Sequence, residues 1–486
     1  MRARSEREYD SALLRLGKLY KCALVLTSSK ERKLIWQLSA IFAILKHRNM
    51  AVGFTKKTVK DIDLKHKRVL LRADYNVPVK DGKISDDYRI KQSVETIKYI
   101  WEQYESSIVI ISHLGRPDGK PAPEFSLKPV AKRLEELLGK PVEFAADTIG
   151  PKAKAACEGL KPGQILLLEN VRFDGREEKN SKDYAKELVE TTKAEVFVQD
   201  GFGVVHRAHA TTEAITHLLP SVAGLLLARE VETIEKAVKD PARPLVSVVG
   251  GAKISDKIEV LNKLIEISEV VAVVGAMANI FLIAEKFKVG KSLADREELG
   301  IAKDILVHVR REEKRRNFNF LLPIDVVVSK KMDGTAATRL VDLAANNLAD
   351  IQAYPKLPKR SAYTVGEDEI ILDVGPISAA MIAGTIKLSN TVIWNGPCGV
   401  TETKGIAGAH DPFAHATHTI MDAMIGTSNQ HINKPFSLVG GGDTVSYVEK
   451  QGMTEDFSHV STGGGASLEL IAGHKLPGVE ALQDKN

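Results

Sequence analysis

Short, nearly continuous aliphatic runs alternate with amphipathic stretches from residue 54 onward, and this pattern constrains the fold more than any other feature. Strands that are buried on both faces of a parallel sheet have this composition. The stretch Leu127–Leu138 has apolar residues at helical spacing and is followed by Gly139, which predicts a helix that ends there. The first series of runs comprises Arg68–Arg72, Ile108–Ser112, Ile165–Leu168 and Val196–Val198.

A second series begins after residue 244. Its runs are Leu245–Val249, Val270–Val274, Val326–Val328, Thr391–Trp394, Ser437–Val439 and His459–Ser461. Between the two series, Leu225–Val238 has helical periodicity and is followed by Pro241 and Pro244. A chain of 486 residues is too long for one ordinary core. We therefore expect an α/β fold with two doubly wound, parallel-sheet domains of the Rossmann-like type, joined by a hinge helix.

The expected boundaries are an N-terminal extension at 1–49, a first domain at 50–224, the hinge helix at 225–240, a second domain at 241–470 and a tail at 471–486. The extension holds eleven lysines and arginines against four acids. Its apolar stretch Leu34–Leu45 is shorter than the ~20 residues that span a bilayer, and no small-residue cleavage site follows it. We favour Met50 as the natural start, with a targeting peptide and a genuine extra segment as the alternatives.

Composition favours a globular protein of a reducing compartment. Hydrophobic residues make up 44% and charged residues 27% of the chain. The three cysteines, Cys22, Cys157 and Cys398, form no CxxC pair, which favours a cytoplasmic location. The extension carries more excess positive charge than the whole chain, whose net charge is +5. The rest is therefore near neutral, and we expect neither nucleic acid nor a membrane as a partner.

Cationic and polar residues follow the runs of the first series. Ligands of open α/β sheets bind beyond the carboxyl ends of the strands. Guanidinium groups match carboxylate and phosphate oxygens, so several arginines at one edge predict a small, strongly anionic ligand, although each alone is more often a surface ion-pair partner. The segments concerned are Asp74-Tyr75-Asn76, His113-Leu114-Gly115-Arg116, Asn170-Val171-Arg172 and His206-Arg207-Ala208-His209, with Arg89 after the first loop.

Glycine clusters follow the runs of the second series. Glycine lets the backbone approach a phosphate closely at a helix start, whereas one cluster alone is more often only a tight turn. Several clusters at one edge favour a nucleotide site, where Asp443 and Glu402 offer oxygen ligands for Mg²⁺ or a ribose. The clusters are Gly250-Gly251-Ala252-Lys253, Gly275-Ala276-Met277, Asn395-Gly396-Pro397, Gly440-Gly441-Gly442-Asp443 and Ser461-Thr462-Gly463-Gly464-Gly465.

Two familiar phosphate-binding motifs are missing from the sequence. Val289-Gly290-Lys291-Ser292 resembles the end of a P-loop, but Glu285 stands where the first glycine belongs. No G-x-G-x-x-G opens the first strand–helix unit, which argues against a dehydrogenase. We therefore expect a phosphate-handling protein without a Walker motif.

Long motifs throughout residues 54–486 resemble the phosphoglycerate kinase family, in the family's order. They are RADYNVP, SHLGRPDG, LLENVRF, HRAHA, GGAKISDK, WNGP, GGGDT and HVSTGGGASLELIAG. The resemblance implies a glycolytic and gluconeogenic transferase that moves a phosphoryl group reversibly from 1,3-bisphosphoglycerate to ADP, giving 3-phosphoglycerate and ATP. It further implies Mg²⁺ with the nucleotide, a monomer, closure about the hinge helix, and a tail that returns to the first domain.

The resemblance also assigns site residues. A catalytic role falls to Arg89, Lys253 and the backbone N–H groups of Gly464 and Gly465, and Asp443 is implied as the magnesium ligand. The implied phosphoglycerate site comprises Asp74, Tyr75, Asn76, Arg89, His113, Leu114, Gly115, Arg116, Arg172 and Arg207. The implied nucleotide site comprises Gly251, Lys253, Lys257, Asn395, Glu402, Gly441, Gly442, Asp443 and Thr444, with Glu402 on the ribose.

The chain departs from the family's pattern at a few positions, which bear on the shape of the nucleotide pocket. They are Gln199 for Asn, Val274-Gly275-Ala276 for three glycines, Cys398 for Met or Val, and Thr401 for Phe. These departures motivate a non-catalytic paralogue that binds nucleotide or phosphoglycerate as one alternative. A different small-molecule kinase on a related fold is another. The set of charged site residues is complete, which favours the kinase over both alternatives. Arg310–Asn319 and Ser428–Pro435 are irregular for the family, and we expect surface loops there.

Overall fold

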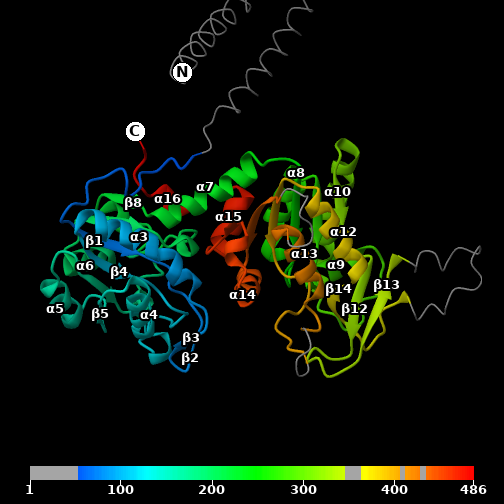
Figure 1. Cartoon of the computed structure of the whole chain (residues 1–486), viewed down its shortest axis with the longest axis horizontal. Helices are drawn as coiled ribbons and strands as arrows, with labels where there is room; N and C mark the ends of the chain where they lie inside the picture. Colours follow the sequence, from blue (N-terminus) through cyan, green and yellow to red (C-terminus); the bar gives the residue numbers. More distant parts are fainter. Residues whose placement is uncertain (1–52, 345–362, 406–410, 427–433, 486) are drawn as a thin grey trace, which may run out of the picture. The chain divides into compact units, whose positions relative to one another are not determined.

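Six parallel strands form the first sheet, in the order β5-β6-β4-β1-β7-β8 (Figure 1). The computed structural model describes residues 53–344, 363–405, 411–426 and 434–485, so the expectations for 1–49 and for most of Ser428–Pro435 lie outside it. Central β1 pairs with β4 on one side and β7 on the other. The strands are β1 (Arg68–Arg72), β4 (Ser107–Ile111), β5 (Val142–Ala145), β6 (Ile165–Leu168), β7 (Val196–Gln199) and β8 (Ser221–Ala223).

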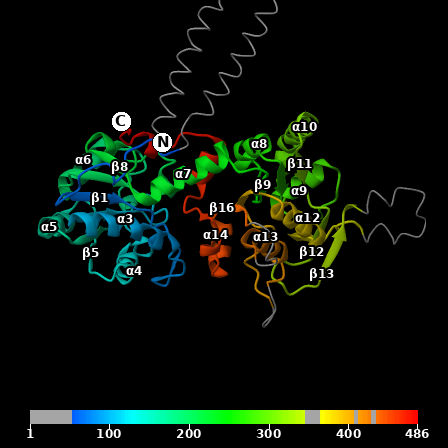
Figure 2. The same cartoon turned by 45° about the horizontal axis from the view of Figure 1, so that its top comes forward.

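Helices cover both faces of this sheet (Figures 1 and 2), and alternate residues of its strands pack against the two helix layers. Val69 and Leu71 pack with α3 (Tyr88–Tyr104) and α4 (Lys128–Leu138). Leu70 packs instead with α5 (Pro151–Gly159) and α6 (Lys182–Thr192). Burial on both faces explains why the runs are continuously aliphatic. As predicted, α4 ends at Gly139, which adopts the left-handed conformation with φ 67°. A short hairpin, β2 (Val79–Lys80) and β3 (Lys83–Ile84), precedes α3.

The second sheet is also six-stranded and parallel, in the order β11-β10-β9-β15-β16-β17. One of its faces packs with α8, α9, α10 and α15, and the other packs with α12, α13 and α14. The strands are β9 (Leu245–Val249), β10 (Val270–Val273), β11 (Asn319–Leu321), β15 (Thr391–Asn395), β16 (Phe436–Gly440) and β17 (His459–Val460). The helices are α8 (Ile258–Ile267), α9 (Ala276–Ala284), α10 (Leu299–Arg315), α12 (Pro376–Lys387), α13 (His415–Ile425), α14 (Gly442–Lys450) and α15 (Gly465–Ala472).

Two expectations for this region were wrong. Val326–Val328 lies in β12 (Asp325–Ser329), which belongs to a separate three-stranded antiparallel sheet with β13 (Thr338–Asp342) and β14 (Ile370–Val374). An aliphatic run fits any buried strand, so its composition does not reveal its partners. The predicted loop at Arg310–Asn319 is mostly regular structure, because α10 continues to Arg315 and β11 begins at Asn319.

Helix α7 (Leu225–Lys239) follows β8 and precedes β9, and it matches the predicted hinge helix in extent. Its first turn is capped by the buried Asp200, whose Oδ1 accepts from Leu226 N at 3.0 Å and Leu227 N at 3.2 Å. Its last turn carries Lys236 and Lys239, which complement the helix dipole. Residues Phe54–Asn486 form one compact unit, so the division into two domains stays a prediction.

The C-terminal tail contacts elements of the first sheet. After α16 (Pro477–Glu480), Gln483 N donates to Ser221 O of β8 at 3.0 Å. Gly478 N donates to Val205 O at 2.8 Å, in the loop that follows β7. No described helix has the length and apolar character needed to cross a bilayer.

Candidate active site

A buried ion cluster lies at the carboxyl edge of the first sheet. Arg72, the last residue of β1, is 1% exposed, and its Nη2 lies 3.3 Å from His113 Nδ1. Its Nε donates to Thr211 Oγ1 at 2.9 Å. The buried carboxylate of Glu177 accepts from Thr211 N at 3.0 Å and from Thr211 Oγ1 at 2.5 Å. Sequence reasoning missed Arg72 and Glu177. The only signal for Arg72 was a charge at the end of an aliphatic run.

The loops after β1 and β4 are held together by short-range contacts. Asp74 lies 3.6 Å from Arg89 Nη1 and 3.8 Å from His113 Nδ1. Arg89 Nη1 also donates to Asn76 O at 2.8 Å. Asn76 Oδ1 accepts from Gly115 N at 2.9 Å. The structure therefore brings these five predicted site residues together at one edge.

Three further predicted arginines follow β4, β6 and β7. Arg172 is buried, where its Nη1 donates to Gly115 O at 2.8 Å and its Nε lies 3.2 Å from Glu178. Arg207 is exposed and donates to His206 Nε2 at 3.1 Å. Arg116 is exposed and makes no hydrogen bond or ion pair within the described residues. Arg116 and Arg207 therefore carry positive charge that no described carboxylate neutralises, which suits an anionic ligand.

The histidines of this edge are held neutral. Burial lowers the pKa of His113 well below its usual value, and nearby Arg72 and Arg172 lower it further. Burial, followed by Arg172 and Arg72, lowers the pKa of His209 to about 4. At neutral pH the positive charge of the edge therefore resides on the arginines.

Two predicted binding residues turn their side chains away from the edge. Tyr75 is fully buried in the hydrophobic core, and its hydroxyl lies 3.0 Å from Ser93 Oγ. Leu114 is 3% exposed and belongs to the same core, and its carbonyl accepts from Asn170 Nδ2 at 2.7 Å. Both positions shape the loops by packing, so direct ligand contact by these side chains is not expected.

Closely packed glycines line the carboxyl edge of the second sheet. Gly250 N donates to Asn395 O at 2.8 Å where β9 and β15 end. A β-carbon on Gly396, whose φ is +112°, would collide with the Gly250 carbonyl. A side chain is therefore excluded where the two strand ends meet, which leaves the backbone open to a ligand.

Lys257 lies behind this edge as a half-buried cation. Its Nζ donates to Gly250 O and to Asn395 Oδ1, each at 2.5 Å. Burial lowers its pKa to about 8, partly opposed by Asp443 and Asp256. The amide Nδ2 of Asn395 is buried without a partner in the described part of the chain, and it lies against Gly441. Thr444 Oγ1 accepts from Gly396 N at 2.8 Å. A cation and an unused donor thus lie beside the glycine edge.

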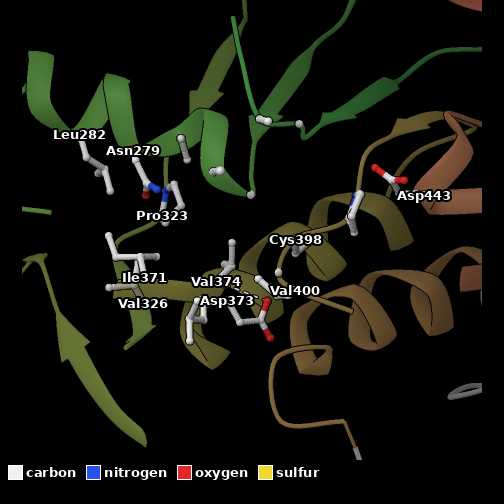
Figure 3. Close-up of a pocket in the computed structure, with 18 of the residues that line it drawn as sticks. Asn279, Leu282, Pro323, Val326, Ile371, Asp373, Val374, Cys398, Val400 and Asp443 are labelled. Atoms are coloured by element: carbon white, nitrogen blue, oxygen red, sulfur yellow. Dashed lines mark hydrogen bonds between the residues drawn. The ribbon is translucent and has the colours of Figure 1, made fainter. Parts of the chain in front are cut away.

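A cavity of about 180 Å³ opens beside this edge, and Figure 3 shows its walls. Gly251, Glu402 and Asp443 line it, as do two of the departures from the family pattern, Ala276 and Cys398. In Figure 3, Asp443 lies at one end, and Asn279 and Leu282 of α9 lie at the other. Gln199 is buried at the end of β7 in the first sheet, so its departure cannot shape this cavity.

The four predicted catalytic positions lie in different surroundings. Arg89 and Gly464 line a second cavity, of about 280 Å³, together with Gly441 and Gly442. Gly465 begins α15, and a β-carbon there would lie 3.4 Å from His206 Nε2. Lys253, by contrast, is exposed and lies 3.2 Å from Asp295. The structure therefore brings Arg89 to the glycine edge, whereas Lys253 is paired elsewhere.

Comparison with known proteins gives one consistent result. The family model described as phosphoglycerate kinase matches residues 59–474. The phosphoglycerate kinase of Moorella thermoacetica is 40% identical, over 88% of this chain and all of that protein. That of Chloroflexus aurantiacus is 44% identical, over 88% of this chain and 99% of its own.

Solved structures give the same result. The structure of phosphoglycerate kinase from Coxiella burnetii is 35% identical with a TM-score of 0.70, and covers 88% of this chain and 98% of its own. That from Pyrococcus horikoshii is 29% identical with a TM-score of 0.69, over the same shares of the two chains.

Proposed function

This chain belongs to the phosphoglycerate kinase family, and we propose that the carboxyl edges of its two parallel sheets hold the two substrates. The chain transfers a phosphoryl group reversibly from 1,3-bisphosphoglycerate to ADP, giving 3-phosphoglycerate and ATP. The observation that carries the proposal is the contrast between the edges. The first presents guanidinium groups, such as that of Arg116, that no carboxylate of the described residues neutralises. The second presents glycine backbone at helix starts, beside the half-buried cation of Lys257.

The arginine edge binds the phosphoglycerate. Arg116, Arg172 and Arg207 bind its anionic oxygens, because guanidinium groups match carboxylate and phosphate geometry. Neutral His113, together with Asp74 and Asn76, orients the loops that carry these groups. Arg89 shares a cavity with Gly441, Gly442 and Gly464 of the glycine edge, so its role is to neutralise the phosphoryl group in transfer.

The glycine edge binds the nucleotide. The backbone of Gly251, Gly441 and Gly442 approaches the phosphates. Lys257 and Asn395 Nδ2, which has no partner among the described residues, act as donors. Thr444 holds the Gly396 backbone in place, and Glu402, exposed on the cavity wall, is placed to bind the ribose.

Asp443 fits a magnesium ion shared with the nucleotide. No group of three carboxylate, histidine or cysteine side chains in the described part of the chain could hold a metal alone. Mg²⁺ commonly uses one or two carboxylates and completes its shell with substrate phosphates and water. Asp443 is exposed in the first turn of α14, where phosphates would approach. When bound, the ion neutralises charge on the phosphate oxygens.

Transfer itself depends on position and charge. Lys253 leaves Asp295 to neutralise the moving group from the nucleotide side, opposite Arg89. The N–H groups of Gly464 and Gly465, at the start of α15, add donors. No general base is needed toward ATP, because the acceptor oxygen of ADP is already ionised. Closure about α7 assembles these groups and excludes water. We expect a cytoplasmic monomer. Within the described residues, no feature favours a non-catalytic binding protein.

The test is a coupled assay with 3-phosphoglycerate, MgATP and glyceraldehyde-phosphate dehydrogenase, in which product formation consumes NADH. We expect sustained NADH consumption that requires both substrates and magnesium. An intact, nucleotide-binding protein without turnover would instead support the non-catalytic alternative.

A further inference from the structure

One side chain of α3 packs into the hydrophobic core of the second sheet. Tyr88 is the first residue of α3, whose Ile90 and Ile97 belong to the core of the first sheet. Tyr88 itself is 9% exposed and belongs to a cluster of the second sheet, together with Val448 of α14 and Val460 of β17. Among the described residues, it is the only member of that cluster that precedes β9. The side chain of Tyr88 therefore connects elements of the two sheets.

The hydroxyl of Tyr88 fixes the end of this side chain. It donates to Val460 O at 2.7 Å. Strand β17 is the last strand of the second sheet, so one of its sides has no neighbouring strand to supply a donor. Val460 is 5% exposed, and its buried carbonyl would lose this partner without the hydroxyl. Burial, followed by nearby Glu230 and Glu449, raises the pKa of Tyr88, so the hydroxyl stays protonated and remains a donor.

Both ends of this contact lie next to residues with proposed roles in phosphoryl transfer. Arg89 follows Tyr88 directly in α3. On the other side, the segment Ser461–Gly463 leads from Val460 to Gly464, which precedes α15. Tyr88, Arg89 and Gly464 all line the cavity of about 280 Å³. The contact thus joins the residue beside Arg89 to the strand that leads to the Gly464 N–H group.

The guanidinium of Arg89 is held only from the side of the first sheet. Its Nη1 donates to Asn76 O at 2.8 Å and lies 3.6 Å from Asp74, and both partners belong to the loop after β1. Within the described residues, it makes no hydrogen bond or ion pair with the second sheet. A displacement of about 1 Å between reacting groups can lower a rate about a hundredfold. The position of Arg89 relative to Gly464 therefore depends on the contact that Tyr88 makes.

We propose that Tyr88 is a positioning residue for phosphoryl transfer: its side chain holds the start of α3 against β17 and so sets where Arg89 lies relative to the N–H groups of Gly464 and Gly465. The inference rests on the proposed function, which assigns charge stabilisation to these residues. A tyrosine with a purely structural role would stabilise the packing without any link to Arg89. The two roles therefore differ in whether loss of the hydroxyl acts through Arg89.

Tyr88→Phe tests the proposal, because it removes the hydroxyl and keeps the ring. We expect kcat in the coupled assay to fall about tenfold, whereas the dissociation constants for ADP and 3-phosphoglycerate, measured by calorimetry, should change less than about twofold. Tyr99→Phe is the matched control and should keep the kcat of the parent. Tyr99 lies on the same helix, and its hydroxyl lies 3.5 Å from that of Tyr104, at the helix end. A folded Tyr88→Phe protein with the kcat of the parent would overturn the proposal.

A double-mutant cycle shows whether the loss acts through Arg89. In the Arg89→Ala background, Tyr88→Phe should lower kcat by less than about twofold, because the guanidinium that Tyr88 positions is gone. An equal loss in both backgrounds would contradict the proposal, since Tyr88 would then act by another route. Tyr88→Leu also removes the hydroxyl and keeps an apolar side chain, and it takes the same place in the cycle if Tyr88→Phe does not fold.

Hydrogen exchange separates this inference from the proposed function, because it needs no turnover. The N–H groups of Ser461 and Thr462 are hydrogen-bonded, as is that of Lys91 in the first turn of α3. In nucleotide-free Tyr88→Phe, we expect all three to exchange faster than in the parent. Faster exchange in a protein without turnover would contradict the kinase activity and leave the contact of Tyr88 standing. Turnover combined with unchanged exchange and unchanged kcat in the variant would contradict the role of Tyr88 alone.

Discussion

Individual buried charged residues set the charge state of each sheet edge before its ligand binds. Arg72 and Glu177 are both fully buried, and burial raises the pKa of Glu177 while Arg72 opposes that rise. Removing one partner would leave the other charge uncompensated, which commonly costs about 3 to 5 kcal/mol. The neutral His113 depends on the same cluster, since Arg72 helps to lower its pKa. The charge state of the arginine edge is thus fixed by the fold.

The role proposed for Lys257 predicts that nucleotide binding depends on pH. An amine must be protonated to bind phosphate, and this one has a pKa of about 8, whereas lysine ordinarily titrates near 10.5. The nucleotide-free protein loses this charge as the pH rises through about 8. We expect the dissociation constant for ADP to rise about fivefold from pH 8 to pH 9, since the protonated fraction of a group with a pKa of about 8 falls from about one half to about one tenth over this range. Calorimetry at fixed ionic strength and magnesium measures it.

Lys257→Arg is the matched control for this effect. Arginine keeps its charge at both pH values. The variant should therefore bind ADP with little change between pH 8 and pH 9. An equally steep loss of affinity in this variant would assign the titration to another group.

The sequence predicted many site residues and missed those that act through packing. Arg116, Arg207 and the glycine clusters follow aliphatic runs, so their place at a strand edge follows from the α/β pattern. Arg72 is the last residue of such a run, and Glu177 lies in a polar loop, so nothing local shows that both are buried together. Asn279 likewise lies in an ordinary helix, and only the packing around it shows that it is buried in the wall of the cavity.

At the scale of elements, β9 and β15 meet so closely that the glycine edge tolerates no side chain. In Gly396→Ala, the added β-carbon collides with the Gly250 backbone, and φ of +112° is unfavourable for alanine. We expect a loss of about 2 to 4 kcal/mol of unfolding free energy, together with weaker ADP binding. Urea unfolding and calorimetry measure the two effects.

Gly384→Ala is the control for this substitution. Gly384 lies within α12, and a β-carbon there meets nothing within 4 Å. Alanine should stabilise the helix by about 0.5 to 1 kcal/mol and leave ADP binding unchanged. A Gly396→Ala protein as stable as the parent would contradict the close packing of β9 on β15.

Helix α14 places the carboxylate of Glu449 beside the acidic residues that precede α3, where a negative charge is unfavourable. Burial, followed by the nearby Asp86 and Asp87, raises the pKa of Glu449 to about 9. A raised pKa means that the contribution to stability is complete below about pH 4.5 and declines as the pH rises toward 9. Glu449→Gln avoids this decline. The half-buried side chain moderates the effect, so we expect the variant to gain about 1 to 2 kcal/mol over the parent by pH 9.

Urea unfolding from pH 5 to pH 9 measures this difference. Glu455→Gln, at an exposed position nearby, should follow the parent at every pH. A constant offset between Glu449→Gln and the parent across the pH range would show that Glu449 does not titrate as described.

The pattern of elements was predictable where each run is buried on both faces. The bounds of β6 and β9 match their aliphatic runs, and α7 ends at Lys239, one residue before the predicted boundary of the hinge helix at 240. Strand β5 was missed because its sequence, VEFA, is short and only partly apolar. The antiparallel pairing of β12 could not be predicted, since pairing depends on which strands are brought beside it.

For the whole molecule, the proposal requires that both edges act on one phosphoryl group. Arg89 shares a cavity with Gly441, whereas Lys253 is paired with Asp295. We expect the radius of gyration in small-angle scattering to fall when 3-phosphoglycerate and a nucleotide are bound together, because closure brings Lys253 to the phosphates. Either ligand alone should produce a smaller change. A radius unaffected by both ligands would argue against closure about α7.

The most direct test of this account compares Arg89→Ala and Lys253→Ala in the coupled assay, with ligand binding measured alongside. We predict that each substitution lowers kcat by about a hundredfold or more, since each removes charge stabilisation from the transition state. Arg89→Ala should still bind ADP normally, and Lys253→Ala should still bind 3-phosphoglycerate, because each substrate is held mainly at its own edge. Turnover near the parent rate in either folded variant would contradict the claim that both edges act on the transferred group.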